Sequence, residues 1–209
     1  MRLRFDDREH ILKLTHPRGV RQSTALAWAA TQKRWVEEQL ERALPPEPLV
    51  PGAIIPIEGS DVELVWDERA RRTPVLAGVT LVCGGPEEGF ARRVELFLKR
   101  FALATLSRET AEFADRAGLR AVSVRIGDAR TRWGSCSSKG AVRYSWRLIL
   151  APREARRFVV AHEVAHLKHL DHGQKFKALE RELFEGDVVA AELLLRESAP
   201  RLRRIAVTR

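Results

Sequence analysis

Four of the six histidines in this 209-residue chain lie in one short segment, VVAHEVAHLKHLDHG (residues 159–173). Within that segment, His162-Glu163-Val164-Ala165-His166 is an HExxH motif in a run of helix-forming residues. Positions four apart share one face of a helix, so the imidazoles of His162 and His166 can hold the same metal ion. Glu163 is adjacent to His162, and its carboxylate can reach a water activated by that ion without being a ligand.

The third ligand of such a site must come from beyond the motif. On a straight helix, His169 lies about 10.5 Å along the axis from His162, which is too far for one ion to bind both. His172 precedes Gly173, where the helix is expected to break, so the chain can bring this imidazole back toward the metal. We therefore expect His172 to be the third ligand, and His169 to be a surface residue or a partner of a ligand.

A carboxylate on the following helical stretch is the alternative third ligand, with Glu180 and Glu182 as candidates. Three imidazoles favour Zn²⁺, because catalytic zinc takes three protein ligands and leaves one position open for water. Structural zinc sites usually have four protein ligands, often thiolates, and the two cysteines, Cys83 and Cys136, form no CxxC pair. The histidine segment therefore indicates a zinc-dependent hydrolase with Glu163 as the general base.

The elements that must position these residues can be read from hydrophobic patterning. Pro152 is expected to open the motif helix at a position where proline is tolerated. The other elements predicted for the C-terminal half are a helix over residues 94–118, a strand over 121–128, a hairpin joining 132–136 to 142–150, and helical stretches at 176–184 and 187–199.

The first 90 residues are predicted to form a small β-rich part with one helix. Residues 2–14 alternate loosely and predict a strand, and residues 24–44 have a helical stripe that PPEPLVPG (45–52) ends. Residues 53–83 contain β-rich runs separated by glycine turns, which predict a small meander. We expect this part to be followed by a metallopeptidase domain over residues 91–209.

Three segments of the chain resemble the YgjP-like metallopeptidases, a bacterial branch of the zincins related to SprT and Wss-type proteases. They are RWGSC (132–136), SWRLILAP (145–152) and VVAHEVAHLKHLDHGQKF (159–176). The resemblance implies an α+β fold, in which a zincin-like domain places the HExxH helix beside a small antiparallel sheet. It also implies zinc as the cofactor and a protein or peptide as the substrate.

By this resemblance, the zinc ligands are His162, His166 and His172, and Glu163 is the catalytic base. Zincins place an edge strand beside the metal, and an extended peptide can pair with such a strand.

The RWGSC segment is a candidate for this edge, where Gly134 would let a backbone approach closely. The oxyanion that forms on the attacked carbonyl needs a donor, and Tyr144, Arg132 and Arg147 are the candidates.

Positive charge is concentrated in the C-terminal half. Residues 91–209 hold 25 Lys/Arg and 14 Asp/Glu, whereas the net charge of the whole chain is +9. Such a balance is typical of contact with nucleic acid or another polyanion, and Arg153, Arg156 and Arg157 are candidates for phosphate contact. The alternative function is therefore a nucleic-acid-binding module with a structural zinc site.

The sequence favours a cytoplasmic protein that has no contact with a membrane. Its first ten residues, MRLRFDDREH, include acidic residues and lack the apolar run of a signal peptide. No uninterrupted apolar stretch reaches the length of a membrane span. The two distant cysteines also make a disulfide framework unlikely to form, as expected for a reducing compartment.

Overall fold

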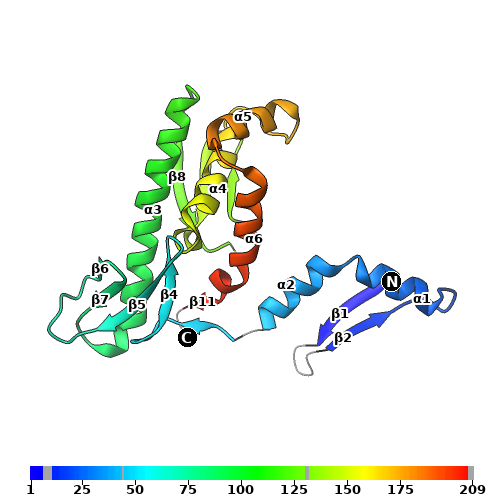
Figure 1. Cartoon of the computed structure of the whole chain (residues 1–209), viewed down its shortest axis with the longest axis horizontal. Coiled ribbons are helices and arrows are strands. Elements are labelled where there is room, and N and C mark those ends of the chain that lie inside the picture. The colour runs from blue at the N-terminus through cyan, green and yellow to red at the C-terminus, as the bar shows by residue number, and fades with distance from the viewer. Residues whose placement is uncertain (7–10, 44, 130–131, 207–209) are drawn as a thin grey trace. The chain divides into compact units, whose positions relative to one another are not determined.

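The computed structural model describes residues 1–6, 11–43, 45–129 and 132–206 (Figure 1). The chain divides into two compact units, Met1–Glu47 and Pro48–Arg209. The larger unit contains the HExxH segment and all the elements that position it.

The smaller unit consists of a β-hairpin followed by two helices. Its elements are β1 (Arg2–Asp6), β2 (Ile11–Thr15), α1 (Gln22–Ala30) and α2 (Lys33–Ala43), and β1 pairs antiparallel with β2. The prediction of a single helix over residues 24–44 is wrong, because α1 ends before Thr31. The Thr31 hydroxyl donates a hydrogen bond to the Trp28 carbonyl (2.7 Å), and such a local bond competes with continued helix. Leu44 lies outside the described residues.

A four-stranded sheet follows in the larger unit. The short strand β3 (Glu47–Pro48) precedes this sheet and is not part of it. The four strands of the sheet are β4 (Ile54–Ile57), β5 (Ser60–Trp66), β6 (Val75–Ala77) and β7 (Thr80–Cys83), and their order in the sheet is β4-β5-β7-β6. The expected meander is wrong, since β7 lies between β5 and β6 and runs parallel to β5. Leu81 and Cys83 of β7 are fully buried, so this strand takes an inner place while the shorter β6 takes the edge.

The rest of the chain is mainly helical and matches most of the predicted elements. These are η1 (Glu87–Gly89), α3 (Phe90–Arg116), β8 (Ser123–Gly127), β9 (Gly134–Cys136), β10 (Ala141–Ser145), η2 (Trp146–Ile149), α4 (Arg153–Ala165), α5 (Gln174–Phe184), α6 (Val188–Arg204) and β11 (Ile205–Ala206). The long helix α3 ends just before Gly118, whose φ of +64° is the left-handed conformation that favours glycine after a helix.

The sheet beside α4 has the order β8-β10-β9 and is mixed. The expected antiparallel pairing is confirmed for β9 and β10, but β8 and β10 are parallel. The antiparallel pairing of β9 and β10 results from the hairpin at Ser137–Gly140, which is closed by a hydrogen bond from the Gly140 amide to the Ser137 carbonyl (2.9 Å). Strand β10 lies between β8 and β9 and runs opposite to β9. Its other neighbour, β8, runs in the same direction as β10.

Helix α4 lies at the centre of the larger unit. Figure 1 shows it between α3 and α6, and it also contacts α5 and β9. Its buried side, which includes Val160, Ala161 and Val164, belongs to one hydrophobic cluster with Leu64 of β5 and Leu81 of β7. The hydrophobic core therefore extends across the predicted boundary at residue 90.

Among the described helices, none combines the length and apolar composition that a bilayer crossing requires.

The extent of this core predicts where the chain can be shortened. Removal of residues 1–47 should leave a protein that unfolds cooperatively, because the remaining unit keeps the whole cluster around α4. Removal of residues 1–88 should abolish cooperative unfolding, since it strips Leu49, Ile55, Leu64 and Leu81 from that cluster. Thermal melts followed by near-ultraviolet circular dichroism measure both.

The division into residues 1–90 and 91–209 remains a prediction. Cooperative unfolding of the 89–209 fragment would support this division and contradict a shared core.

Candidate metal centre

The HExxH residues lie in the last turn of α4, which ends earlier than the sequence predicts. Ala165 is its last residue and His166 caps it, with the His166 amide still donating to the His162 carbonyl (3.2 Å). Tight turns follow, in which the amides of Lys168 and His169 both donate to the Ala165 carbonyl. The regular helix therefore ends before His169, about two turns earlier than the break that the sequence predicts near Gly173.

The three histidines expected to bind a metal come together at this helix end. One ring nitrogen from each of His162, His166 and His172 lies within 4.8 Å of the others, and no fourth His, Cys, Asp or Glu joins this group among the described residues. The Nε2 atoms of His162 and His172 are 3.3 Å apart. Two nitrogens at the usual zinc distance and tetrahedral angle are also about 3.3–3.4 Å apart. The residues present therefore fit a tetrahedral zinc ion.

Hydrogen bonds at the opposite ring nitrogens orient two of these imidazoles. His162 Nδ1 donates to Glu180 Oε1 (2.6 Å), and His166 Nδ1 donates to the His169 backbone carbonyl (3.0 Å). Because both partners accept, both Nδ1 atoms carry the hydrogen and both Nε2 atoms keep the lone pair that a metal needs. Glu180, the alternative third ligand, thus lies behind His162, and His169 acts through its backbone.

An aromatic ring that sequence reasoning missed lies against all three histidines. Phe176 of α5 is buried, and its ring centroid is 5.0, 4.5 and 4.8 Å from those of His162, His166 and His172. Burial lowers the pKa of His166, and the neighbouring His162 and His172 act in the same direction. His166 therefore favours the neutral imidazole, which is the form that binds a metal. The only sequence signal for Phe176 is its place four residues after His172.

Glu163 is buried against the first residue of strand β9. A Cβ atom at Gly134 would fall 2.6 Å from Glu163 Cγ and 2.7 Å from Cδ, so only glycine fits at this position. The sequence predicts a close backbone approach at Gly134, and its partner in the structure is the Glu163 side chain. Burial raises the pKa of Glu163 to about 7, against the opposing charges of His162 and Arg132. Among the described residues, Glu163 Oε2 has no hydrogen-bond partner.

Strand β9 is an edge of its sheet and contacts α4, as the RWGSC segment predicts. A cavity of about 260 Å³ lies alongside it, and the lining includes three of the four candidate substrate contacts, Arg132, Gly134 and Tyr144. Arg132 is exposed and lies close enough to Glu163 to lower the pKa of that carboxyl.

Tyr144 and Arg147 are held more firmly by the core. The Tyr144 hydroxyl shares a hydrogen bond with Thr110 Oγ1 (3.0 Å), and burial raises the pKa of the phenol. The buried Arg147 pairs with Asp128 and donates to the Ile205 carbonyl (3.1 Å), and its side chain is absent from the described lining of the cavity. Their roles at an oxyanion remain predictions.

The contact between Gly134 and Glu163 predicts a position-specific effect of an added methyl group. Gly134→Ala should lower the free energy of unfolding by about 1–3 kcal/mol, because the methyl group overpacks the strand against the helix. Gly127→Ala is the matched control, since a Cβ there meets only the Arg143 side chain, at an ordinary contact distance of 3.6 Å or more. Urea denaturation of both variants measures the difference. Equal destabilisation would show that the Gly134 contact is not specific.

Comparison with known proteins places this site in a family. The family model described as YgjP-like, metallopeptidase domain matches residues 1–196. The solved metallopeptidase zymogen of Pyrococcus abyssi abylysin is 22% identical, with 49% of this chain and 99% of that chain covered and a TM-score of 0.40. A search of curated proteins finds no match. Since the family match extends over most of the sequence and includes the histidine cluster, the resemblance noted from the sequence is confirmed, and the chain belongs to the YgjP-like metallopeptidase family.

Proposed function

We propose that this protein is a zinc-dependent metallopeptidase that hydrolyses peptide bonds, with Glu163 as general base. The observation that carries the proposal is the convergence of His162, His166 and His172. The buried carboxylate of Glu163 lies in the same helical turn as His162. Membership in a metallopeptidase family implies a divalent metal and a protein or peptide substrate. A set of three imidazoles, to which the described residues add no fourth ligand, supports zinc in a catalytic role.

Bound zinc would lower the pKa of a water at its open position from 15.7 toward about 7. Glu163 is placed to accept the proton of the attacking water through Oε2, which has no other partner among the described residues. Burial strengthens this carboxylate as a base, because a low-dielectric surrounding favours its neutral form. Glu163 then returns the proton to the leaving amine.

The substrate is proposed to bind as an extended strand along β9. This strand lies at a sheet edge, so its outer backbone groups are available for pairing in the described part of the fold. Gly134 brings the start of β9 against Glu163, which places a paired peptide close to the base. Arg132 is the exposed candidate for contact with the oxyanion.

The alternative, a nucleic-acid-binding module with structural zinc, remains a prediction. Two of its three candidate arginines are occupied, since Arg156 pairs with Glu109 and Arg157 pairs with Glu112. The two functions make different predictions, because a metallopeptidase shows peptide hydrolysis that depends on Glu163 and a binding module shows none.

The proposed mechanism predicts that Glu163→Gln separates metal binding from turnover. The amide has nearly the same shape but accepts no proton at neutral pH, so peptide hydrolysis should fall by about 10²–10⁴-fold. Zinc content by elemental analysis should equal that of the wild type, because Glu163 is not among the grouped ligand atoms. Cleavage of a peptide library, read by mass spectrometry, measures turnover, with exposed Glu192→Gln as the control. Unchanged cleavage by Glu163→Gln would rule out its role.

The histidine geometry predicts opposite results at two neighbouring histidines. His166→Ala should lose zinc and melt at a lower temperature, because the ion ties the end of α4 to the loop that carries His172. His169→Ala should keep both its zinc and its melting temperature, since alanine retains the backbone carbonyl that orients His166. Elemental analysis and thermal melts of both variants are the measurements. Loss of zinc from His169→Ala would mean that its imidazole is a ligand.

A further inference from the structure

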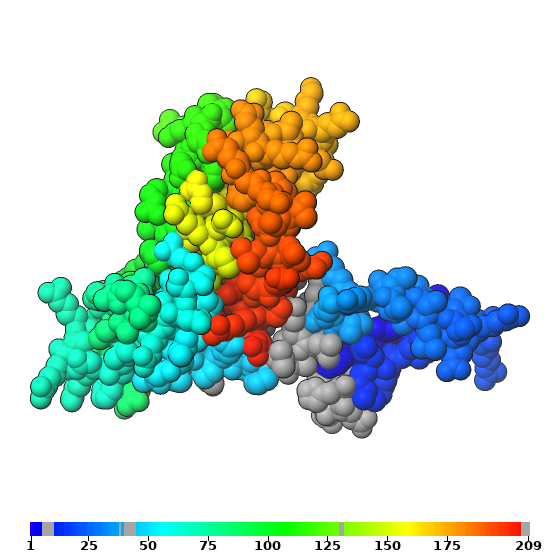
Figure 2. Space-filling model, viewed as in Figure 1, coloured from blue at the N-terminus to red at the C-terminus, as the bar shows by residue number. Residues whose placement is uncertain are grey.

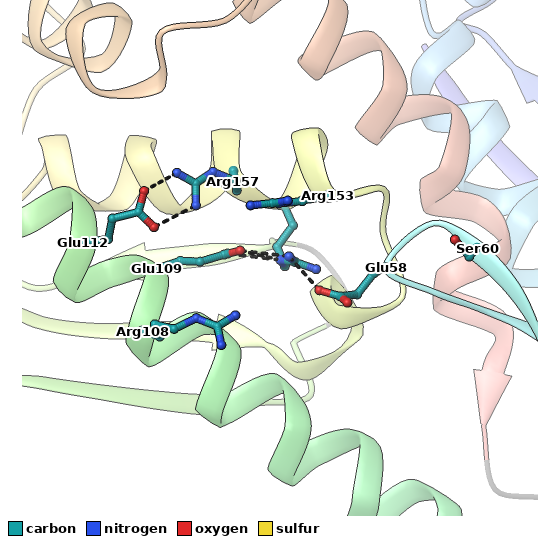
Figure 3. Close-up of a pocket in the computed structure, with 8 residues that line it drawn as sticks. Glu58, Ser60, Arg108, Glu109, Glu112, Arg153 and Arg157 are labelled. Atoms are coloured by element: carbon teal, nitrogen blue, oxygen red, sulfur yellow. Dashed lines mark hydrogen bonds and ion pairs between the residues drawn. The ribbon is translucent and has the colours of Figure 1, made fainter. Parts of the chain in front are cut away.

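A second cavity, of about 460 Å³, lies beside the first turns of α4, at the other end of this helix from His166. Its lining comes from the β4–β5 turn, from α3 and from α4 (Figure 3). Figure 2 shows the region where these segments meet at the surface, with the start of α4 in yellow, α3 in green and the β4 segment in cyan. The lining residues are Glu58, Ser60, Arg108, Glu109, Glu112, Arg153, Arg156 and Arg157.

Ion pairs compensate part of this charge. Arg157 makes a two-pronged pair with Glu112, with N–O distances of 2.9 and 2.5 Å. The guanidinium of Arg156, which is only 1% exposed, donates to both oxygens of Glu109 and also pairs with Glu58 (3.0 Å). All three carboxylates of the lining are therefore already bonded to a guanidinium.

Positive groups remain after this pairing. Arg108 and Arg153 are exposed and make no hydrogen bond or ion pair with any described residue. In the view of Figure 3, their side chains lie on the two sides of Glu109, the residue that pairs with Arg156. The Nη1 atom of Arg156 is buried and lacks an acceptor among the described residues. A buried donor without an acceptor is unfavourable, so an acceptor that enters the cavity and reaches this nitrogen would be stabilised.

The chemistry of the lining limits what this group can be. All eight side chains are charged or carry a hydroxyl, so the lining is mainly polar and holds no aromatic ring or apolar side chain that would favour a base or a hydrophobic ligand. Guanidinium groups match the oxygens of phosphate with paired hydrogen bonds. The cavity also lies at the start of a 13-residue helix, where the helix dipole favours negative charge.

We propose that this cavity is an oxyanion site that binds a phosphate group through Arg108 and Arg153, above the buried guanidinium of Arg156. The site is separate from the histidine cluster and goes beyond peptide hydrolysis. Because Arg156 and Arg157 are held by carboxylates, the two exposed arginines supply the free charge. The phosphate comes either from a free anion or from a nucleic-acid backbone, which share this chemistry.

Titration of the full chain with inorganic phosphate, followed by calorimetry at constant ionic strength, tests the site directly. The double variant Arg108→Gln/Arg153→Gln should weaken phosphate binding by about tenfold or more, because it removes both charge-assisted contacts. The control is Arg120→Gln/Arg196→Gln, which removes the same charge from exposed arginines outside the cavity lining and should change affinity by less than about twofold. Circular dichroism of both variants confirms that they fold.

A second arm repeats the comparison with a short single-stranded DNA across a salt series. If the cavity takes backbone phosphates, the cavity variant loses more DNA affinity than the control. If it takes a free anion, the two variants bind DNA alike and differ only in the phosphate arm. Absence of phosphate binding by the wild type, or equal behaviour of the two variants in both arms, would overturn the proposal. Neither arm measures turnover, so the result is independent of the peptidase assignment.

Discussion

The contact between Gly134 and Glu163 is the constraint on which the rest of the site depends. Because residue 134 has no side chain, strand β9 reaches the end of α4 closely enough to bury the Glu163 carboxylate. The same approach brings an edge strand to the helix end that carries the histidine cluster, so a buried carboxylate, three imidazoles and an open strand edge lie within one small region. A larger residue at position 134 would push strand and helix apart and separate these three elements.

Contacts along helix α4 fix the orientation of the residues that it carries. Its apolar side is anchored in the core by residues such as Val160 and Val164, while Arg156 ties its start to Glu109 of α3. A buried bidentate pair of this kind is geometrically demanding, and it contributes orientation more than net stability. The helix therefore has little freedom to rotate, and the face that carries His162 and Glu163 is directed toward β9 and α5.

Local patterns in the sequence predict most of the elements and the three histidines, because these depend on short-range spacing. The HExxH motif, the end of the helix predicted over residues 94–118 and the hairpin that joins residues 132–136 to 142–150 are all read within a few residues. The order of the strands is not local, so the inner places of β7 and β10 were not predicted. For the same reason, the sequence offers Glu180 only as a possible ligand and does not indicate Phe176, since the contacts of both with the histidines arise only when α5 folds back over the end of α4.

The ring of Phe176 has a consequence for metal choice. It packs against all three imidazoles and fills the space on one side of them, so no oxygen ligand can approach from that side. Magnesium and calcium prefer six or more oxygen ligands. The histidine cluster offers three ligand atoms, and all of them are nitrogens. Ions that accept a few imidazole nitrogens at short distance are favoured instead. A hydrocarbon side chain that binds nothing itself thus leaves the imidazole nitrogens as the donors on this side of the cluster.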